Sequence, residues 1–94
     1  MPIDVEWDPS KARTNLEKHG ISFSDVEPAF YDEFAISISD EFSEAEERFL
    51  LIGRDALGRV LTVSYAYRGD SIRLISARPS TKSERREYEK ELRF

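Results

Sequence analysis

Four strand-like segments between residues 34 and 78 most constrain how this chain can fold. They span residues 34–40, 48–54, 60–68 and 72–78, and turn residues separate them. Apolar residues in these segments alternate with polar ones at the two-residue period of a strand, or form a short apolar run. Gly69 and Asp70 form a two-residue turn between the last two segments, and glycine in the first position suits a type II′ hairpin turn. The pattern predicts a four-stranded antiparallel meander.

The short hairpin also predicts which side chains share a face of the sheet. If Arg68 opposes Ser71, one face collects Leu61, Val63, Tyr65, Tyr67, Ile72, Leu74, Ser76 and Arg78. We expect this apolar face to form the core, and the same counting places Arg48 on it, opposite Tyr65. Arginines at the margin of an apolar face commonly reach solvent or pair with acids, which is the structural interpretation of Arg48 and Arg78.

Helices are predicted before and after the meander along the chain, and we expect them to pack on its core face. A short strand over residues 3–7 leads into a helix over residues 9–19, with Asp8 as N-cap, Pro9 in the first turn and Gly20 at the C-terminal end. Ser22 marks the start of a second helix, which Pro28 should kink or end early. A capping box predicts a last helix from Thr81 to about residue 92. The expected fold class is α+β, as a single domain over residues 1–94.

The first helix carries a polar stripe, because Lys11, Asn15 and Lys18 recur at helical spacing on one side. Two interpretations stand at this point. The stripe is either a solvated basic surface or a surface that faces phosphates or a protein partner.

Composition narrows the classes of function. The chain has no cysteine, which excludes disulfides, thiolate zinc sites and cysteine nucleophiles. No apolar run is long enough to span a bilayer, and no signal peptide is recognisable, so we expect a cytoplasmic protein without membrane association. One histidine and scattered carboxylates show no metal-ligand spacing, so neither a metal nor a cofactor is expected.

The net charge of −5 hides a strong asymmetry. Residues 1–47 hold 13 acids and 3 lysines or arginines, whereas residues 48–94 hold 6 acids and 11 lysines or arginines. An acidic protein is a poor general ligand for nucleic acid, because phosphate binding favours net positive charge. The basic second half can still present a local patch that binds RNA if its arginines share one face.

Five blocks of residues occur in series along nearly the whole chain. They are Trp7-Asp8 with Lys11, Asn15 and Lys18-His19-Gly20-Ile21-Ser22-Phe23; Glu47-Arg48-Phe49 with Gly53-Arg54; Gly58-Arg59-Val60-Leu61-Thr62-Val63; Arg73-Leu74-Ile75-Ser76-Ala77-Arg78-Pro79; and Glu84-Arg85 with Tyr88. In order and spacing this series resembles the BrnT-type toxins, also called the DUF497 family. The resemblance implies a RelE-like α+β fold and an RNA-cleaving toxin of a bacterial type II toxin–antitoxin pair. It also implies neutralisation by a ribbon-helix-helix antitoxin (BrnA-like). The toxin would then be bound to DNA only indirectly, through this antitoxin.

A metal-independent ribonuclease must activate the ribose 2′-hydroxyl, stabilise the charged phosphate and protonate the leaving oxygen. Arginine suits the second task, and the match to the family blocks favours Arg48 and Arg78. His19 is the only imidazole for proton transfer, and Glu47 is a candidate base. The expected RNA-binding residues are Lys11, Lys18, Arg54, Arg68 and Arg73.

Alternatives remain for these residues and for the whole chain. His19 is equally suited to complement the dipole at its helix C-terminus, and Glu47 to be a surface carboxylate. For the chain, the second hypothesis is a non-catalytic module that binds the antitoxin and tunes operon repression. The third is an unrelated small α+β interaction domain. Convergence of the basic residues on one open surface would favour the ribonuclease.

Overall fold

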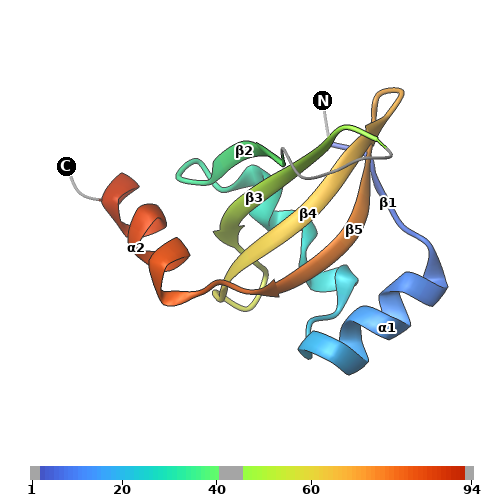
Figure 1. The fold of residues 1–94 in the computed structure, drawn as a ribbon, viewed down its shortest axis with the longest axis horizontal. Coiled ribbons are helices and arrows are strands. Elements are labelled where there is room, and N and C mark those ends of the chain that lie inside the picture. The colour runs from blue at the N-terminus through green and yellow to red at the C-terminus, as the bar shows by residue number, and fades with distance from the viewer. Residues whose placement is uncertain (1–2, 41–45, 93–94) are drawn as a thin grey trace.

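The fold is a mixed five-stranded sheet with helices on its margins and behind it (Figure 1). The computed structural model describes residues 3–40 and 46–92. The strands are β1 (Val5–Glu6), β2 (Ile36–Asp40), β3 (Arg48–Arg54), β4 (Val60–Arg68) and β5 (Ser71–Pro79), in the spatial order β1-β5-β4-β3-β2. Strands β2 to β5 form the predicted antiparallel meander. The short first strand enlarges it to a mixed sheet, because β1 pairs in parallel with β5.

The hairpin between β4 and β5 has the predicted register at its turn. Arg68 pairs with Ser71, and Gly69 has the positive φ of 62° that the turn requires. Further along, the register shifts: Tyr65 pairs with Leu74, but Ser64 pairs with Ser76. The residue between them in β5 is therefore a β-bulge, which inverts the facing of everything beyond it.

This bulge corrects two sequence predictions. Ala77, which pairs with Val63, takes the buried place on the core face, whereas Ser76 and Arg78 lie on the opposite face. The expected position of Arg48 is also wrong, because Phe49, not Arg48, pairs with Tyr65. Both Arg48 and Arg78 thus project from the face opposite the core, which we call the open face.

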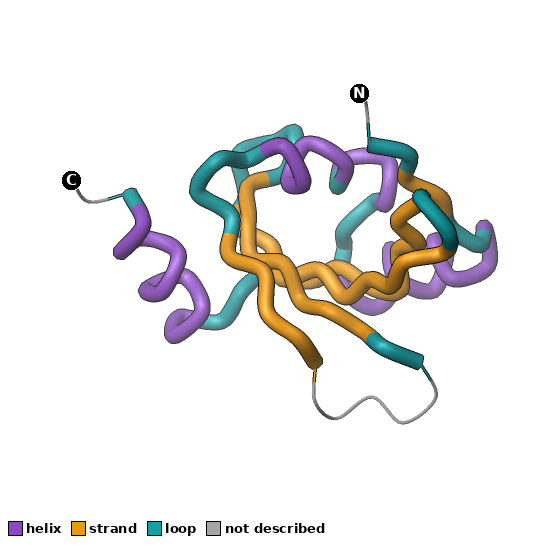
Figure 2. Tube along the Cα trace, turned by 90° about the horizontal axis from the view of Figure 1, so that it is seen from above, coloured by secondary structure: helices purple, strands orange, loops and turns teal. Residues whose placement is uncertain are grey.

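Two short 3-10 helices cover the core face instead of the predicted second α-helix. They are η1 (Phe23–Asp25) and η2 (Glu27–Tyr31), and they pass behind the sheet in Figure 1 and along one side of it in Figure 2. Pro28 lies in the first turn of η2, where its missing N–H is tolerated, but it prevents one continuous α-helix. Phe23, Val26 and Ala29 from these turns are fully buried against the sheet.

A close approach between η2 and β3 explains one glycine. A Cβ atom at Gly53 would lie 3.0 Å from the carbonyl oxygen of Ala29. Glycine therefore lets the covering turn pack directly on the backbone of β3.

The two α-helices flank the sheet at opposite ends (Figures 1 and 2). Helix α1 (Pro9–His19) lies beside β5, and α2 (Lys82–Glu91) packs near β3 through the buried ring of Tyr88. The predicted caps are present: Asp8 accepts from the Ser10 amide, and Thr81 and Glu84 form the capping box. Among the described residues, neither helix has the length and apolar character that crossing a bilayer needs.

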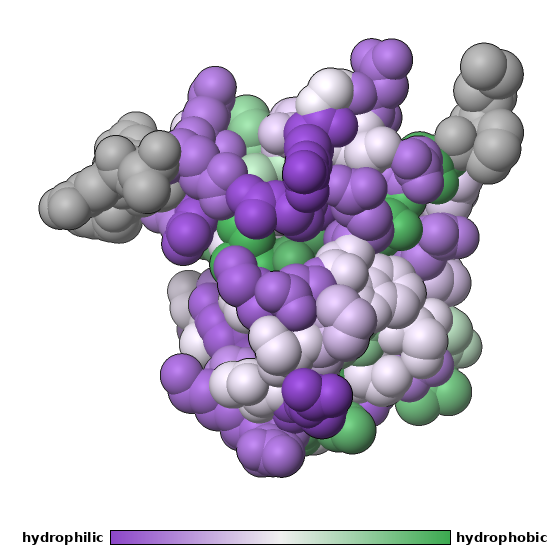
Figure 3. Space-filling model, turned by 90° about the vertical axis from the view of Figure 1, so that its right-hand side faces the viewer, coloured by the Kyte–Doolittle hydropathy of each residue, from purple (hydrophilic) through white to green (hydrophobic). Residues whose placement is uncertain are grey.

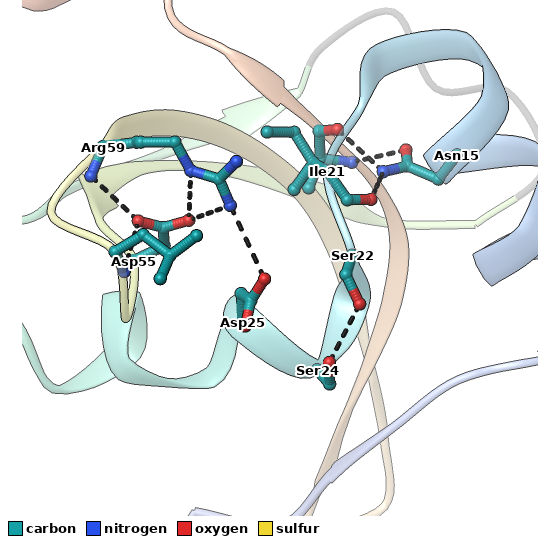
Figure 4. Close-up of polar contacts among 9 residues, drawn as sticks. Asn15, Ile21, Ser22, Ser24, Asp25, Asp55 and Arg59 are labelled. Carbon is teal, nitrogen blue, oxygen red and sulfur yellow. Dashed lines mark hydrogen bonds and ion pairs between the residues drawn. The ribbon is translucent and has the colours of Figure 1, made fainter.

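Asn15 joins α1 to the sheet. Its side chain is only 4% exposed and bonds the backbone of β5 like a neighbouring strand: the amide donates to the Ala77 carbonyl at 2.9 Å, and the Ala77 N–H donates to Oδ1 at 2.9 Å (Figure 4). The same amide nitrogen also donates to the Ile21 carbonyl at 3.0 Å. One side chain thus connects α1 to the turn that follows it and to the edge strand β5.

A second buried polar group orders the turn between β3 and β4. The Asp55 carboxylate accepts from the amides of Leu57 and Arg59 and from the Arg59 guanidinium, at 2.6 to 3.0 Å. Arg59 also approaches Asp25 of η1 at 3.7 Å, which links the turn to the core cover (Figure 4).

We predict that Asn15→Ala destabilises the fold by about 2–4 kcal/mol, because it removes three hydrogen bonds and leaves buried backbone groups of Ala77 unpaired. Urea denaturation, monitored through the fluorescence of Trp7, measures this loss of stability. Glu17→Ala, at an exposed position of the same helix, is the matched control. Equal stability of the two variants would contradict the role assigned to Asn15.

Candidate functional site

The basic stripe of α1 faces a hollow at the edge of the sheet. Lys11, Lys18 and His19 line this hollow, which has a volume of about 260 Å³, together with Ser76 of β5. The other lining residues are Ser10, Thr14, Asn15 and Ile75. This side of the molecule faces the viewer in Figure 3, where hydrophilic side chains cover most of the surface and apolar atoms show in the recess across its middle. We call this hollow the α1 hollow.

Ser76 connects the α1 hollow to the open face. It pairs with Ser64 of β4, so two small hydroxyl side chains lie side by side in the middle of that face. Arg78 projects from the same face two residues further along β5. Arg73 projects from it on the other side of the bulge, paired with Ala66. The two serines therefore form a low polar strip, which we call the serine floor. Arg73 and Arg78 lie on either side of it along β5, and every two residues of a strand span roughly 7 Å.

Arg48 and Arg73 converge on one carboxylate. Nη2 of Arg73 donates to both oxygens of Glu46 at 2.6 Å, and Nε of Arg48 lies 3.7 Å from Oε1 of Glu46. The sequence predicts an acidic loop over residues 41–46, of which only Glu46 lies within the described residues. Glu47, the candidate base, is exposed beside this cluster.

Arg78 is held by the last helix. Its guanidinium donates to both oxygens of Glu84 at 2.7 and 2.9 Å, and the hydroxyl of Thr62 donates to the same carboxylate at 3.0 Å. The hydrogen bonds from Arg78 hold the pKa of Glu84 down, from an ordinary 4.5 to about 2, and outweigh the cost of its partial burial. The carboxylate in turn raises the pKa of Arg78.

The two remaining arginines lie toward opposite ends of the open face. Arg68 is 75% exposed, lies 3.8 Å from Glu6, and lines a second hollow of about 290 Å³ with Glu6, Trp7, Asp8 and Arg73. Arg54 lies at the far end of β3, with its guanidinium carbon 5.8 Å from the centre of the Tyr88 ring. Neither Arg54 nor Arg68 lines the α1 hollow.

A partly buried hydrogen-bond network near Arg54 anchors α2. The Tyr88 hydroxyl donates to Asp32 at 2.6 Å, and the Arg54 amide donates to the same oxygen at 2.9 Å. Burial opposes ionisation of Asp32, but these hydrogen bonds outweigh it and lower the pKa of the carboxyl. Burial, together with the neighbouring carboxylate, raises the pKa of Tyr88.

Two tyrosines of β4, Tyr65 and Tyr67, differ in burial. Tyr65 is buried, and its hydroxyl bonds the Ser37 hydroxyl at 2.7 Å, so it is part of the core. Burial raises the pKa of this phenol. Tyr67 is 59% exposed, but it extends from the core face, away from the arginines.

Sequence reasoning missed three features of this surface. It did not assign the serine floor, because Ser76 was expected on the core face. It treated Glu84 only as a capping residue, although the capping box was the signal that placed the carboxylate near β5. It gave Glu46 no role, because nothing in the local pattern ties residue 46 to residue 73.

The arrangement of cationic side chains is of a kind that binds polyanions. Lysines and an imidazole line the α1 hollow, arginines flank the serine floor, and permanent guanidinium charge suits phosphate recognition. Among the described residues, no group of three or more histidine, cysteine or carboxylate side chains lies close enough to hold a metal ion.

Comparison with known families decides where the chain belongs. Residues 7–84 match the model of the family described as "Ribonuclease toxin, BrnT, of type II toxin-antitoxin system". The chain belongs to the BrnT family. All nine predicted site residues lie within the matched region. No curated protein matches this chain.

A solved BrnT structure has the same fold. The structure is similar to the crystal structure of the Brucella abortus ribonuclease toxin BrnT, with a TM-score of 0.66 and 24% sequence identity. The match covers 85% of this chain and 99% of the Brucella chain. The mixed sheet with its flanking helices is thus a BrnT architecture.

We predict that the Arg78–Glu84 pair makes stability depend on acid pH. Because the folded-state pKa of Glu84 lies below its unfolded value, its contribution is complete above about pH 5 and is lost as the pH falls toward 2. The loss is at most about 3 kcal/mol. Urea denaturation from pH 6 to pH 2.5 should show Glu84→Gln with a flatter pH dependence than the parent chain.

Glu87→Gln serves as the control, because Glu87 lies on the same helix and pairs only at the surface with Lys90. If Glu84→Gln and the parent lost stability in parallel over this range, the pair would not be the cause.

Proposed function

We propose that this BrnT-family chain is a metal-independent endoribonuclease that acts in the cytoplasm and arrests growth by cleaving RNA. One observation carries the proposal. Lys11, Lys18 and His19 share a hollow with Ser76, and Ser76 lies between Arg73 and Arg78 on the open face. Residues from the first helix and from the last strand thus meet on one accessible surface.

The proposed reaction is the one that a RelE-like ribonuclease would carry out. A base removes the proton of the ribose 2′-hydroxyl, whose oxygen attacks the adjacent phosphorus. Arginine stabilises the negative charge of the pentacovalent phosphate, and an acid protonates the departing 5′-oxygen. The products are a 2′,3′-cyclic phosphate and a 5′-hydroxyl.

The side chains of this chain can be assigned to these steps. His19 transfers protons from the rim of the α1 hollow, and Glu47 is the second candidate for the base. Arg48 and Arg78 stabilise the phosphate from either side of the serine floor. Lys11, Lys18, Arg54, Arg68 and Arg73 hold the flanking RNA by its phosphates.

The proposed partner is a ribbon-helix-helix antitoxin of the BrnA type. We expect an antitoxin of this type to be a basic DNA-binding protein. The acidic first half of this chain, with 13 acids against 3 bases, complements that positive charge. The toxin then reaches operator DNA only through the antitoxin.

We predict that the purified chain cleaves single-stranded RNA in the presence of EDTA and leaves 2′,3′-cyclic phosphate ends. His19→Ala and Arg78→Ala should each lower the cleavage rate by about 100-fold, the usual effect of losing an acid–base or charge-stabilising group. End-group analysis of a labelled oligonucleotide measures both.

Glu27→Gln, on η2 behind the sheet, is the control for cleavage. Products with only 3′-hydroxyl ends would contradict the proposed chemistry. A folded Arg78→Ala variant with full activity would remove Arg78 from the site.

A specific observation favours a second function, that of a non-catalytic module that binds the antitoxin and tunes operon repression. Both Arg73 and Arg78 already pair with carboxylates, Glu46 and Glu84, and the chain is acidic overall. Such a surface suits a basic protein partner as well as it suits RNA.

Induced expression separates the two functions. We predict that the wild-type chain alone slows growth, that co-expression with the neighbouring antitoxin restores it, and that His19→Ala is harmless yet still binds the antitoxin. Growth rate and co-purification measure these outcomes. Antitoxin binding without any growth defect or RNA loss would favour the non-catalytic module.

A further inference from the structure

We propose that Arg48 and Arg73 form a phosphate-binding subsite whose resident anion is the carboxylate of Glu46. In this arrangement Glu46 occupies the position that a phosphodiester of bound RNA takes when it displaces the carboxylate. The inference deepens the proposed function, since it rests on RNA as the polyanion that binds this face.

The register of the sheet brings the two arginines to one point. Arg73 pairs with Ala66 in β4, and the neighbouring pair Phe49–Tyr65 places Arg48 on the other side of Ala66. Strands are spaced about 4.8 Å apart, so the two side chains start roughly 10 Å from each other. Because the residue between them is a buried alanine, both long side chains can lean over it toward the same anion.

Glu46 satisfies this pair of cations only in part. Both of its oxygens accept from a single nitrogen, Nη2 of Arg73, instead of from two nitrogens of the guanidinium fork. The contact with Arg48 is longer, at 3.7 Å. Glu46 is therefore bound closely to Arg73 and only loosely to Arg48, which β2 pairs with a second acid, Asp40.

Two donors at this point are unused. Nε of Arg48 and Nε of Arg73 are both buried, and neither has a hydrogen-bond partner among the described residues. Buried donors are normally paired, and an unpaired one costs free energy. A phosphodiester presents two non-bridging oxygens in a tetrahedral arrangement, so one oxygen can accept from each guanidinium group.

The subsite is open to a chain of nucleotides. The side chains of Arg48 and Arg73 are 35% and 30% exposed. Arg73 also lines the second hollow, together with Arg68 and Trp7. Trp7 is 37% exposed as a whole residue, and its ring also contacts Phe23 edge-on.

Glu46 accordingly acts as a built-in competitor. In the free protein it neutralises the arginines and reduces their mutual repulsion. On binding it must leave, so it lowers affinity and weakens the dependence of binding on salt, because fewer counterions are released.

The test compares Glu46→Gln with the parent chain in binding a ten-nucleotide single-stranded RNA with 2′-O-methyl groups throughout, which cannot be cleaved. We expect Glu46→Gln to bind about tenfold more tightly, with a salt dependence steeper by about 0.7 in the log–log slope. Trp7, the only tryptophan, reports binding by fluorescence because it lines the hollow that Arg73 also lines. Inorganic phosphate serves as a second probe.

Two further variants make the test specific. Glu27→Gln changes the charge equally on the opposite side of the sheet and should bind like the parent. Arg73→Gln should bind at least tenfold more weakly, and adding Glu46→Gln to it should bring no gain. Should Glu46→Gln fail to fold, Arg73→Gln still tests the subsite directly.

The outcomes separate this inference from the proposed function. Equal affinity of Glu46→Gln and Glu27→Gln, or unchanged binding by folded Arg73→Gln, would overturn the subsite even if RNA is cleaved normally. A gain with Glu46→Gln that Arg73→Gln abolishes would support it, even if the chain cleaves no RNA.

Discussion

The bond between Asn15 and the backbone of Ala77 is the interaction on which the rest of the structure depends. Within the part of the chain that the structure describes, β1 pairs with β5 only at Ile72 and Arg73, so the far half of that edge has no neighbouring strand there. The Asn15 side chain bonds this edge through both an acceptor and a donor. It thereby sets how α1 lies against the sheet, and with it the position of Lys11, Lys18 and His19.

The bulge in β5 decides which side chains the open face carries. Without it, Ser76 and Arg78 would point into the core, where a guanidinium is costly to bury. The extra residue turns both outward and brings Ala77, which fits beneath the covering turns, into the core. The open face owes its serine floor and one of its flanking arginines to this single irregularity.

Pairing across the chain resolves the contrast between an acidic protein and a basic surface. Acids of the first half meet arginines of the second half, as in Glu46–Arg73, Glu6–Arg68 and Asp25–Arg59. The opposite charges of the two halves thus help hold them together. The pairing also means that several arginines of the site are already neutralised in the free protein, so RNA would have to compete with internal carboxylates for them.

The sequence by itself determined those features that depend on residues within one turn of each other. The caps of both helices, the Gly69 turn and the order of the strands were predictable because capping groups and turn residues act locally. The family was recognisable for a related reason, since its motifs are short blocks. Only the tertiary structure decided which face Arg48 and Arg78 occupy, that the second helix is two 3-10 turns, and that Glu46 lies on Arg73. Each of these results from packing or pairing between distant segments, whose register a local pattern does not contain.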